Sequence, residues 1–308
     1  MSRPALAPLF ALIAVTLFSI NDVAMKFLSG GYALHQLVLL RSVVGILIVM
    51  VVMVPLSGGV HLLRTKRLGA HICRALCVIF ANMMFFLGLA ALPLADAVAI
   101  FFVSPLLITV FSVFFLGETV GARRWSAIAI GMIGVLIVLR PGTASFQAAS
   151  LFPLAAAAGY AGLHIMTRHL RETENAVNMT FYIQVVFIVL TGFLGLTIGD
   201  GKFDIFGDPS SSFLLRAWEM PTGLDWPIIG LLGLFASVGG YFISQAYRLG
   251  EASLIAPFEY LALPLSILWG YLIFQEFPTP IAIFGIGLIL ASGLYTVWRE
   301  HQLAKATS

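Results

Sequence analysis

Polar and ionisable residues interrupt long apolar runs of this chain, and they are the first candidates for chemistry. Asn21 and Asp22 lie in the run near the N-terminus, His164 lies in a run of the second half, and Glu259 stands beside Tyr260 further on. A carboxylate or an imidazole inside such a run can carry a proton, and Glu259 can also balance a ligand amine. We predict Glu259 and Asp22 as residues of ion coupling or of an ion pair.

Asp22 and His164 occupy related places in the two halves of the chain. Sliding the sequence by 142 residues aligns Asp22 with His164 and Lys26 with Arg168. One interpretation is a protonatable pair or a cavity wall. The other is that Asp22 neutralises Lys26, four residues on, at the end of a helix. For His164, which has no acidic residue near it in sequence, we favour a functional role.

Glu259 also has a structural interpretation. It can pair with Arg41 or Arg74, two bases that lie within or at the edges of apolar runs. For these arginines we expect a long side chain that lies along apolar surface and brings its charge to the membrane interface.

Other polar or aromatic side chains inside apolar runs can contact a ligand or hydrogen-bond a neighbouring helix. Phe101 and Phe102 precede Pro105, which removes a backbone donor and bends a helix. Together with Asn21 and His164, we predict a substrate-binding set of Asn82, Phe101, Tyr160, Tyr241, Gln245 and Tyr260.

Familiar catalytic and nucleotide-binding motifs are missing from the sequence. It contains no H-E-x-x-H, no G-x-x-x-x-G-K-[ST] and no G-x-S-x-G. We therefore predict no catalytic residue, no cofactor and no ATP hydrolysis by this chain. Cys73 and Cys77 lie four residues apart in one apolar run, without the spacing of a metal site or disulfide framework. The alternative of another class is a membrane-embedded enzyme that uses His164 with Asp22 or Glu259.

The composition shows which elements must position these candidates. The 308-residue chain is 60% hydrophobic and 10% charged, with a mean hydropathy of +1.01. A soluble domain cannot bury so much apolar surface, so we predict an integral membrane protein. The apolar runs are continuous over roughly 20 residues, the length of a membrane helix, and do not alternate as barrel strands do.

We predict ten membrane-spanning helices in an all-α fold. Their expected ranges are about 5–27, 34–55, 68–91, 94–116, 124–140, 150–167, 177–198, 227–249, 252–275 and 279–298. The connections are short except for residues 199–226, which are acidic and contain Pro and Ser. We expect this segment to be a surface excursion and not a folded domain.

The second half repeats the plan of the first. Pro105 lies in an apolar run that ends at Glu118, and Pro264 lies in one that ends at Glu276, 158 residues later. We therefore divide the chain into two five-helix repeats, residues 1–148 and residues 149–308. An odd number of spans in each half gives the halves opposite orientations, an architecture of transporters with a site between the repeats.

The basic residues predict the orientation in the membrane. If the N-terminus is cytoplasmic, eleven of the 17 Lys and Arg residues fall in cytoplasmic segments and three in outer segments. We expect both termini on the cytoplasmic side of a bacterial inner membrane.

Three stretches resemble a known family. The run W-S-A-I-A-I-G-M-I-G-V-L-I-V-L-R-P-G at Trp125–Gly142, the S-P…G-E run at Ser104–Glu118 and the Y-L-A-L-P…Q-E run at Tyr260–Glu276 are similar to EamA-type repeats of the drug/metabolite transporter superfamily. The resemblance covers nearly the whole chain and implies ten helices in two inverted repeats. Among its branches the chain most resembles bacterial amino-acid exporters. It departs from the usual pattern at Gln275, where Gly often precedes the Glu.

We therefore expect a secondary transporter or facilitator that exports small metabolites, above all neutral or aromatic amino acids, by alternating access around a central cavity. A multidrug or other metabolite exporter is the alternative within transport, and a membrane scaffold without flux is a further one. The expected partners are a small-molecule substrate and the lipid bilayer, with no nucleic acid, and we expect a monomer.

Overall fold

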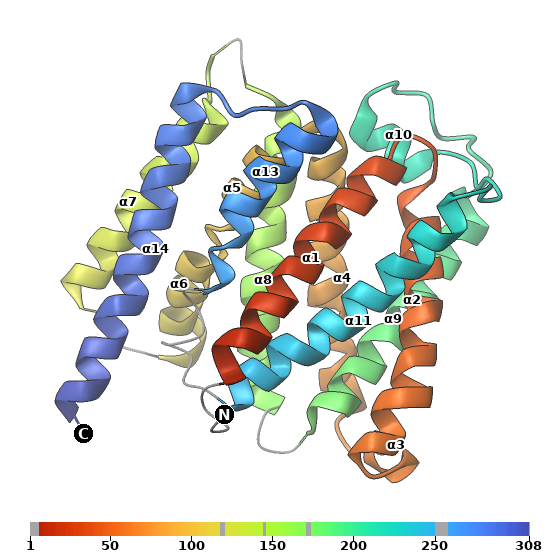
Figure 1. The fold of residues 1–308 in the computed structure, drawn as a ribbon, viewed down its shortest axis with the longest axis horizontal. Helices are drawn as coiled ribbons and strands as arrows, with labels where there is room; N and C mark the ends of the chain where they lie inside the picture. Colours follow the sequence, from red (N-terminus) through yellow and green to blue (C-terminus); the bar gives the residue numbers. More distant parts are fainter. Residues whose placement is uncertain (1–5, 118–120, 144–145, 171–173, 250–257, 308) are drawn as a thin grey trace.

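The protein is a bundle of helices (Figure 1). The computed structural model describes residues 6–117, 121–143, 146–170, 174–249 and 258–307. All elements assigned in these ranges are helical, which confirms the predicted all-α class there. Within these ranges, seven helical segments are long and apolar enough to cross a membrane. Three further apolar helices are shorter: Trp125–Leu139, Ala262–Phe274 and Pro280–Thr296. The total of ten spans therefore stays a prediction.

The first half supplies the long helices α1, α2, α4 and α7 and a pair of shorter ones. Their bounds are α1 (Ala7–Leu28), α2 (Leu34–Ile48), α4 (Leu68–Ala91), α5 (Leu94–Phe101), α6 (Ser104–Leu116) and α7 (Ala122–Leu139). A π-helical turn, η2 (Val49–Met53), leads from α2 into α3 (Val54–Ser57). Pro55 follows this turn, and a proline that cannot donate to the preceding turn explains the local widening. The turn η3 (Val60–Leu63) then leads towards α4.

The second half has the same order of long helices with one addition. Its elements are η4 (Ala148–Ser150), α8 (Leu151–Leu170), α9 (Ala176–Ile198), α10 (Pro209–Leu215), α11 (Asp225–Leu249), α13 (Ala262–Phe274) and α14 (Pro280–Thr307). Side chains cap α9 and α10, because Asn175 and Asp208 each accept a hydrogen bond from the backbone amide three residues on. Hydrogen bonds from Ser211 hold the pKa of the Asp208 carboxyl below its ordinary value.

A helix break close to a proline interrupts one of the predicted spans in each half. The first half turns at Phe102–Val103, between α5 and α6, directly before Pro105. The second half turns at Tyr260–Leu261, directly before α13. The two turns are separated by the offset of 158 residues that aligns the two halves. The predicted interruption at Pro105 is thus confirmed, whereas Pro257 and Glu118 lie outside the described residues.

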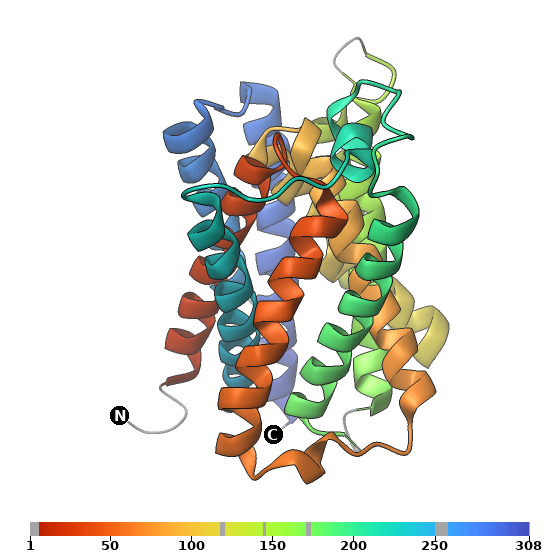
Figure 2. The ribbon, with the colours of Figure 1, turned by 90° about the vertical axis from the view of Figure 1, so that its right-hand side faces the viewer.

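The helices of the two halves interleave. α1 packs most extensively on α11, α4 on α8, α2 on α9 and α7 on α14 (Figures 1 and 2). Replacing each helix by its counterpart in the other half turns the pair α1–α11 into the pair α8–α4. The pairs α2–α9 and α7–α14 are unchanged by this exchange. This pattern agrees with a two-fold repeat. It also means that the halves do not form separate packing units.

Glycines bring α7 and α14 into close contact. A Cβ atom on Gly134 would lie 2.8 Å from the carbonyl oxygen of Gly285, and one on Gly285 would lie 2.8 Å from that of Gly134. The contact is reciprocal, as expected between counterpart helices. Gly287, on the same helix as Gly285, differs, because a Cβ there would meet nothing within 4 Å.

The long connection between α9 and α11 is more ordered than the sequence predicts. Within it, α10 buries Phe213, and Ser210 Oγ donates to the carbonyl of Leu87 at 2.7 Å. Arg216 Nη1 donates to the carbonyl of Ser29 at 3.2 Å. The expected surface excursion therefore contains a helix that is anchored on α4 and on the end of α1.

The described chain begins and ends on one side of the bundle. α1 starts and α14 finishes at the same end, and α10 lies at the opposite end (Figure 1). This placement agrees with an even number of crossings. Which end faces the cytoplasm stays a prediction.

Candidate functional site

Aromatic side chains from both halves form a continuous row, which we call the aromatic row. Ring centroids lie 5.1 Å apart for Phe85 and Phe101, 5.3 Å for Phe101 and Tyr160, and 4.7 Å for Tyr160 and His164. Phe101 also lies 6.4 Å from Phe102, whose ring is 5.2 Å from that of Tyr260. These tilted and edge-on contacts are the geometry that aromatic rings prefer. The members of the row are Phe85, Phe101, Phe102, Tyr160, His164 and Tyr260.

The row lies where the two halves meet. Tyr260 is the counterpart of Phe102 at the offset of 158 residues, and both stand at the helix break of their half. Counterpart residues that touch lie close to the axis that relates the two copies. The helix breaks therefore position a ring from each half at the interface between the halves.

Glu259 joins the row from the second half. Its carboxylate lies close enough to interact electrostatically with the hydroxyl groups of Tyr160 and Tyr260. The structure thus brings together five of the predicted residues: Phe101, Tyr160, His164, Glu259 and Tyr260. This arrangement offers ring faces, phenolic donors, an imidazole and a carboxylate within one group.

A second group surrounds Arg41 on α2, and we call it the buried arginine site. Arg41 is only 7% exposed, and its Nη2 donates to Asn82 Oδ1 on α4 at 3.2 Å. Asp22 on α1 interacts electrostatically with Arg41. The expectation that Arg41 extends to the membrane interface is therefore wrong. Its guanidinium is held between helices.

One ring connects the two groups. The Phe86 centroid lies 5.5 Å from the Arg41 guanidinium carbon and 5.7 Å from the Phe85 ring.

Two predicted residues lie elsewhere, on α11. Tyr241 is 41% exposed and packs on Phe242, and Gln245 makes no hydrogen bond within the part of the chain that the structure describes.

An ion pair links the halves at the end of the bundle where α1 finishes. Lys26 Nζ lies 3.0 Å from Glu276 Oε2, which also accepts from the backbone amide of Leu94 at 3.1 Å. The partner of Lys26 is thus a residue of the other half and not Asp22, four residues away. The sequence aligned Lys26 with Arg168, whose side chain lies outside the described residues.

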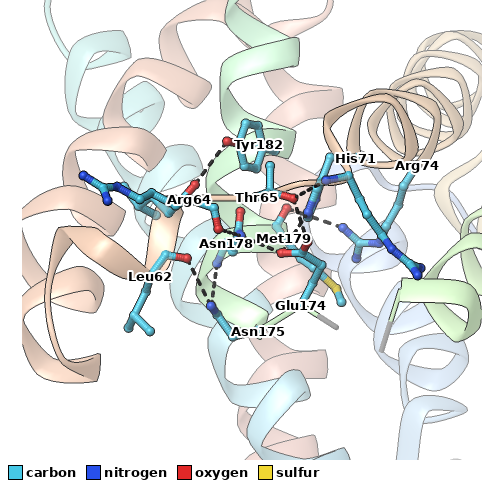
Figure 3. A network of polar contacts seen from close by, with 12 residues as sticks. Leu62, Arg64, Thr65, His71, Arg74, Glu174, Asn175, Asn178, Met179 and Tyr182 are labelled. Carbon is cyan, nitrogen blue, oxygen red and sulfur yellow. Dashed lines mark hydrogen bonds and ion pairs between the residues drawn. The ribbon is translucent and has the colours of Figure 1, made fainter. Parts of the chain in front are cut away.

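A polar network closes the opposite end of the bundle (Figure 3). Glu174 accepts from Thr65 Oγ1 at 2.6 Å and from Asn178 Nδ2 at 2.7 Å, and its Oε2 lies 3.3 Å from His71 Nε2. Arg74 Nε donates to Thr167 Oγ1 at 2.8 Å in the same region. A groove of about 650 Å³ adjoins this network and is lined by Val60, Leu63, Arg64, Thr65, Lys66 and Tyr182.

Sequence reasoning missed Arg41, Phe86 and Glu174 as organising residues. The doublets Phe85–Phe86 and Phe101–Phe102 were a usable signal for two converging ring pairs. Arg41 stands in the middle of an otherwise apolar stretch, where a charged side chain is costly, and this was a second signal in the sequence. Glu174 lies in a charged connection and carries no such signal.

The comparison with known families decides the class of the protein. The EamA-like transporter family matches residues 5–140 and residues 147–298. The chain belongs to the EamA-like transporter family. This EamA-like protein is therefore a multi-pass membrane transporter, as the resemblance of its three stretches implied.

Named relatives extend over most of this EamA-like transporter. It is 26% identical to an S-adenosylmethionine uptake transporter of Rickettsia prowazekii, over 94% of this chain and 92% of the relative. It is 30% identical to a riboflavin transporter of Rhizobium johnstonii, over 79% of this chain and 75% of the relative. A solved crystal structure at 19% identity covers 97% of this chain and 99% of its own, with a TM-score of 0.66, which shows a common fold.

Proposed function

We propose that this EamA-like transporter carries a small metabolite with a planar aromatic or heteroaromatic ring across a bacterial inner membrane. The aromatic row carries this proposal, because it presents Phe101 and Tyr160 beside Phe102 and Tyr260 at the meeting point of the halves. Planar rings stack on aromatic side chains with an attraction of about 0.5–1.5 kcal/mol per contact beyond their buried area.

The relatives support a ring-bearing substrate. S-adenosylmethionine and riboflavin, the compounds for which two of them are named, both contain a flat heteroaromatic ring system. Aromatic amino acids, the cargo expected from the sequence, belong to the same chemical class. Amino-acid export is narrower than these relatives support, and the S-adenosylmethionine relative is named for uptake. We therefore propose the ring-bearing class and no longer favour export over import.

Alternating access around the aromatic row supplies the mechanism. Residues 1–148 and 149–308 act as inverted repeats in this proposal, supported by the exchange of helix pairs between the halves and by the two matched segments. The breaks at Phe102–Val103 and Tyr260–Leu261 give each half a bend at the substrate. His164, Tyr160 and Tyr260 offer hydrogen bonds to the cargo, while Glu259 serves as a proton carrier or as the counter-ion of an amine.

Counterflow into liposomes that contain the purified protein tests this function. The labelled panel is S-adenosylmethionine, riboflavin, tryptophan and phenylalanine, with alanine and glutamate as cargo without rings. We expect at least one ring compound to accumulate faster than in empty liposomes, without ATP, and faster than alanine and glutamate. If no ring compound exceeds the empty liposomes, the proposed function is wrong.

A further inference from the structure

The buried arginine site leaves a charge only partly compensated. Besides its hydrogen bond to Asn82, Arg41 has its guanidinium carbon 5.5 Å from the ring centroids of Phe86 and of Phe187. Rings attract a cation over their faces, and this attraction grows where water is excluded. Neither an amide oxygen nor a ring face, however, replaces an anion.

Arg41 retains unused donors. A guanidinium carries five N–H donors in a planar fork that suits a carboxylate. In the described ranges, its side chain makes the one hydrogen bond to Asn82, and no carboxylate lies within 4.0 Å of it. Asp22 interacts with it only across a longer distance. A buried charge is costly without a close partner of opposite charge. The unused N–H donors of Arg41 could therefore bind a negatively charged group.

Neighbouring polar atoms are also unsatisfied. Asn21 is 4% exposed and Ser42 is 1% exposed. The Asn21 Oδ1 and Ser42 Oγ atoms have no hydrogen-bond partner among the described residues. They are adjacent in sequence to Asp22 and Arg41, on α1 and α2. Buried polar atoms without a partner are rare, so two of them in the helix turns that carry Asp22 and Arg41 favour a region that takes a polar ligand.

We propose that Arg41 and Asp22 bind the zwitterionic head group of an α-amino acid whose ring lies along the aromatic row. Arg41 takes the carboxylate, and Asp22 takes the ammonium group. Phe86 connects the two parts of the site, since its ring contacts both Arg41 and Phe85. This inference rests on the proposed function and narrows its cargo to ring compounds with an amino-acid head group.

Charge balance favours a zwitterion over other anions. With Asp22 ionised, Arg41 and Asp22 together carry no net charge, and a zwitterion adds none, so the net charge of the site stays zero when the ligand enters. A doubly charged phosphate would leave an excess of negative charge beside Asp22. A ring compound without charges would leave the donors of Arg41 unused.

Matched analogues test each half of the head group in proteoliposomes. Unlabelled tryptophan, tryptamine and indole-3-propionate compete against the labelled ring compound that the protein carries. Tryptamine lacks the carboxylate and indole-3-propionate lacks the amine, while the ring is the same. We expect tryptophan to inhibit about 10- to 100-fold more strongly than either analogue, the range expected for a hydrogen bond to a charged group.

Substitutions assign the two charges. Arg41→Gln should remove the preference for tryptophan over tryptamine, and Asp22→Asn should remove the preference over indole-3-propionate, each leaving the other preference in place. Arg74→Gln is the matched control, an arginine that donates to Thr167, and should keep both preferences. If Arg41→Gln does not fold, Arg41→Lys replaces it and should reduce the preference over tryptamine without removing it.

Three results overturn the inference. In the first, tryptophan, tryptamine and indole-3-propionate inhibit the wild-type protein equally. In the second, folded Arg41 and Asp22 variants keep the wild-type preference for tryptophan over both analogues. Flux of riboflavin with no competition by tryptophan or S-adenosylmethionine is the third, and it leaves the proposed function standing. Absence of flux for every ring compound overturns the proposed function as well.

Discussion

The Lys26–Glu276 ion pair shows how single side chains hold the halves together. The Lys26 side chain is 9% exposed and that of Glu276 is 32% exposed, and the two charged atoms lie 3.0 Å apart. Lys26 also lies over the Phe274 ring, 5.2 Å from its centroid. Such a partly desolvated pair costs little when intact, but either partner alone leaves an uncompensated charge.

Lys26→Gln should lower the free energy of unfolding by about 2 kcal/mol, because Glu276 then loses a charged hydrogen-bond partner. The exposed pair Lys202–Asp200 provides the control, since water and salt screen an ion pair at the surface. Thermal melting of purified protein in detergent measures both. Equal melting temperatures for Lys26→Gln and Lys202→Gln would contradict this assignment, and the exchange Lys26→Glu with Glu276→Lys should recover part of the loss.

Residue types alone could predict some of the site but not its pairings. Tyr160, His164 and Glu259 were predictable because a polar side chain within an apolar run is costly wherever its neighbours lie. The partners of Arg41 and Lys26 were not, since Asn82 lies on another helix and Glu276 lies in the connection between α13 and α14. Sequence proximity suggested Asp22 for Lys26, whereas packing between helices decided the actual pair.

Close contact between α7 and α14 depends on small residues. Gly285→Val should lower the free energy of unfolding by about 2 kcal/mol, because its side chain would meet the Gly134 carbonyl and force the helices apart. Gly287→Val on the same helix is the control, since nothing lies within 4 Å of a Cβ there. Melting in detergent should separate the two variants by several degrees. Equal melting would show that this contact does not hold the helices.

α10 is stabilised through one buried ring. Phe213→Ala should lower the free energy of unfolding by about 3–5 kcal/mol, because the ring is 1% exposed and its loss leaves a cavity. Phe206→Ala in the same connection removes a ring that is 68% exposed and should have little effect. Limited proteolysis should then cut residues 199–224 faster in the first variant only. Similar cleavage of both would mean that α10 is not anchored.

Elements with their own hydrophobic signal were predictable, and those without it were not. Long apolar runs gave α1, α4 and α9 within a few residues of their expected bounds, and the run 34–55 matches the continuous segment of α2, η2 and α3, Leu34–Ser57. Pro105 correctly predicted a break because a proline changes hydrogen bonding locally. The seven-residue α10 was missed, since its stability comes from burial of Phe213 against helices distant in sequence.

The interleaving of the two halves constrains how the whole molecule can move. Because α1 packs on α11 and α4 packs on α8, helices of different halves are expected to move together. A separation of residues 1–148 from residues 149–308 as intact bodies would break all four of the most extensive helix pairs. The sequence supported the repeat and its offset of 158 residues, but not this exchange of partners, which depends on three-dimensional packing.

The predicted orientation can be tested by labelling from one side. In a background with Cys73→Ser and Cys77→Ser, Lys66→Cys should react with a membrane-impermeant thiol reagent only from the cytoplasm. Lys202→Cys should react only from outside. Both native residues are exposed. Lys66 lies in the connection from α3 to α4 and Lys202 in the connection from α9 to α10, and α3 and α10 lie at opposite ends of the bundle (Figure 1). Labelling of both positions from the same side would contradict the orientation.

The central claim is that a ring-bearing metabolite crosses the membrane along the aromatic row. The most direct measurement is the KM for counterflow of the transported compound in proteoliposomes. Phe101→Leu and Tyr160→Leu should each raise the KM about 3- to 10-fold, because each removes one ring face from the row. Phe115→Leu, which removes a ring that is 68% exposed, should leave the KM unchanged. Folded Phe101 and Tyr160 variants with wild-type KM and rate would contradict the claim.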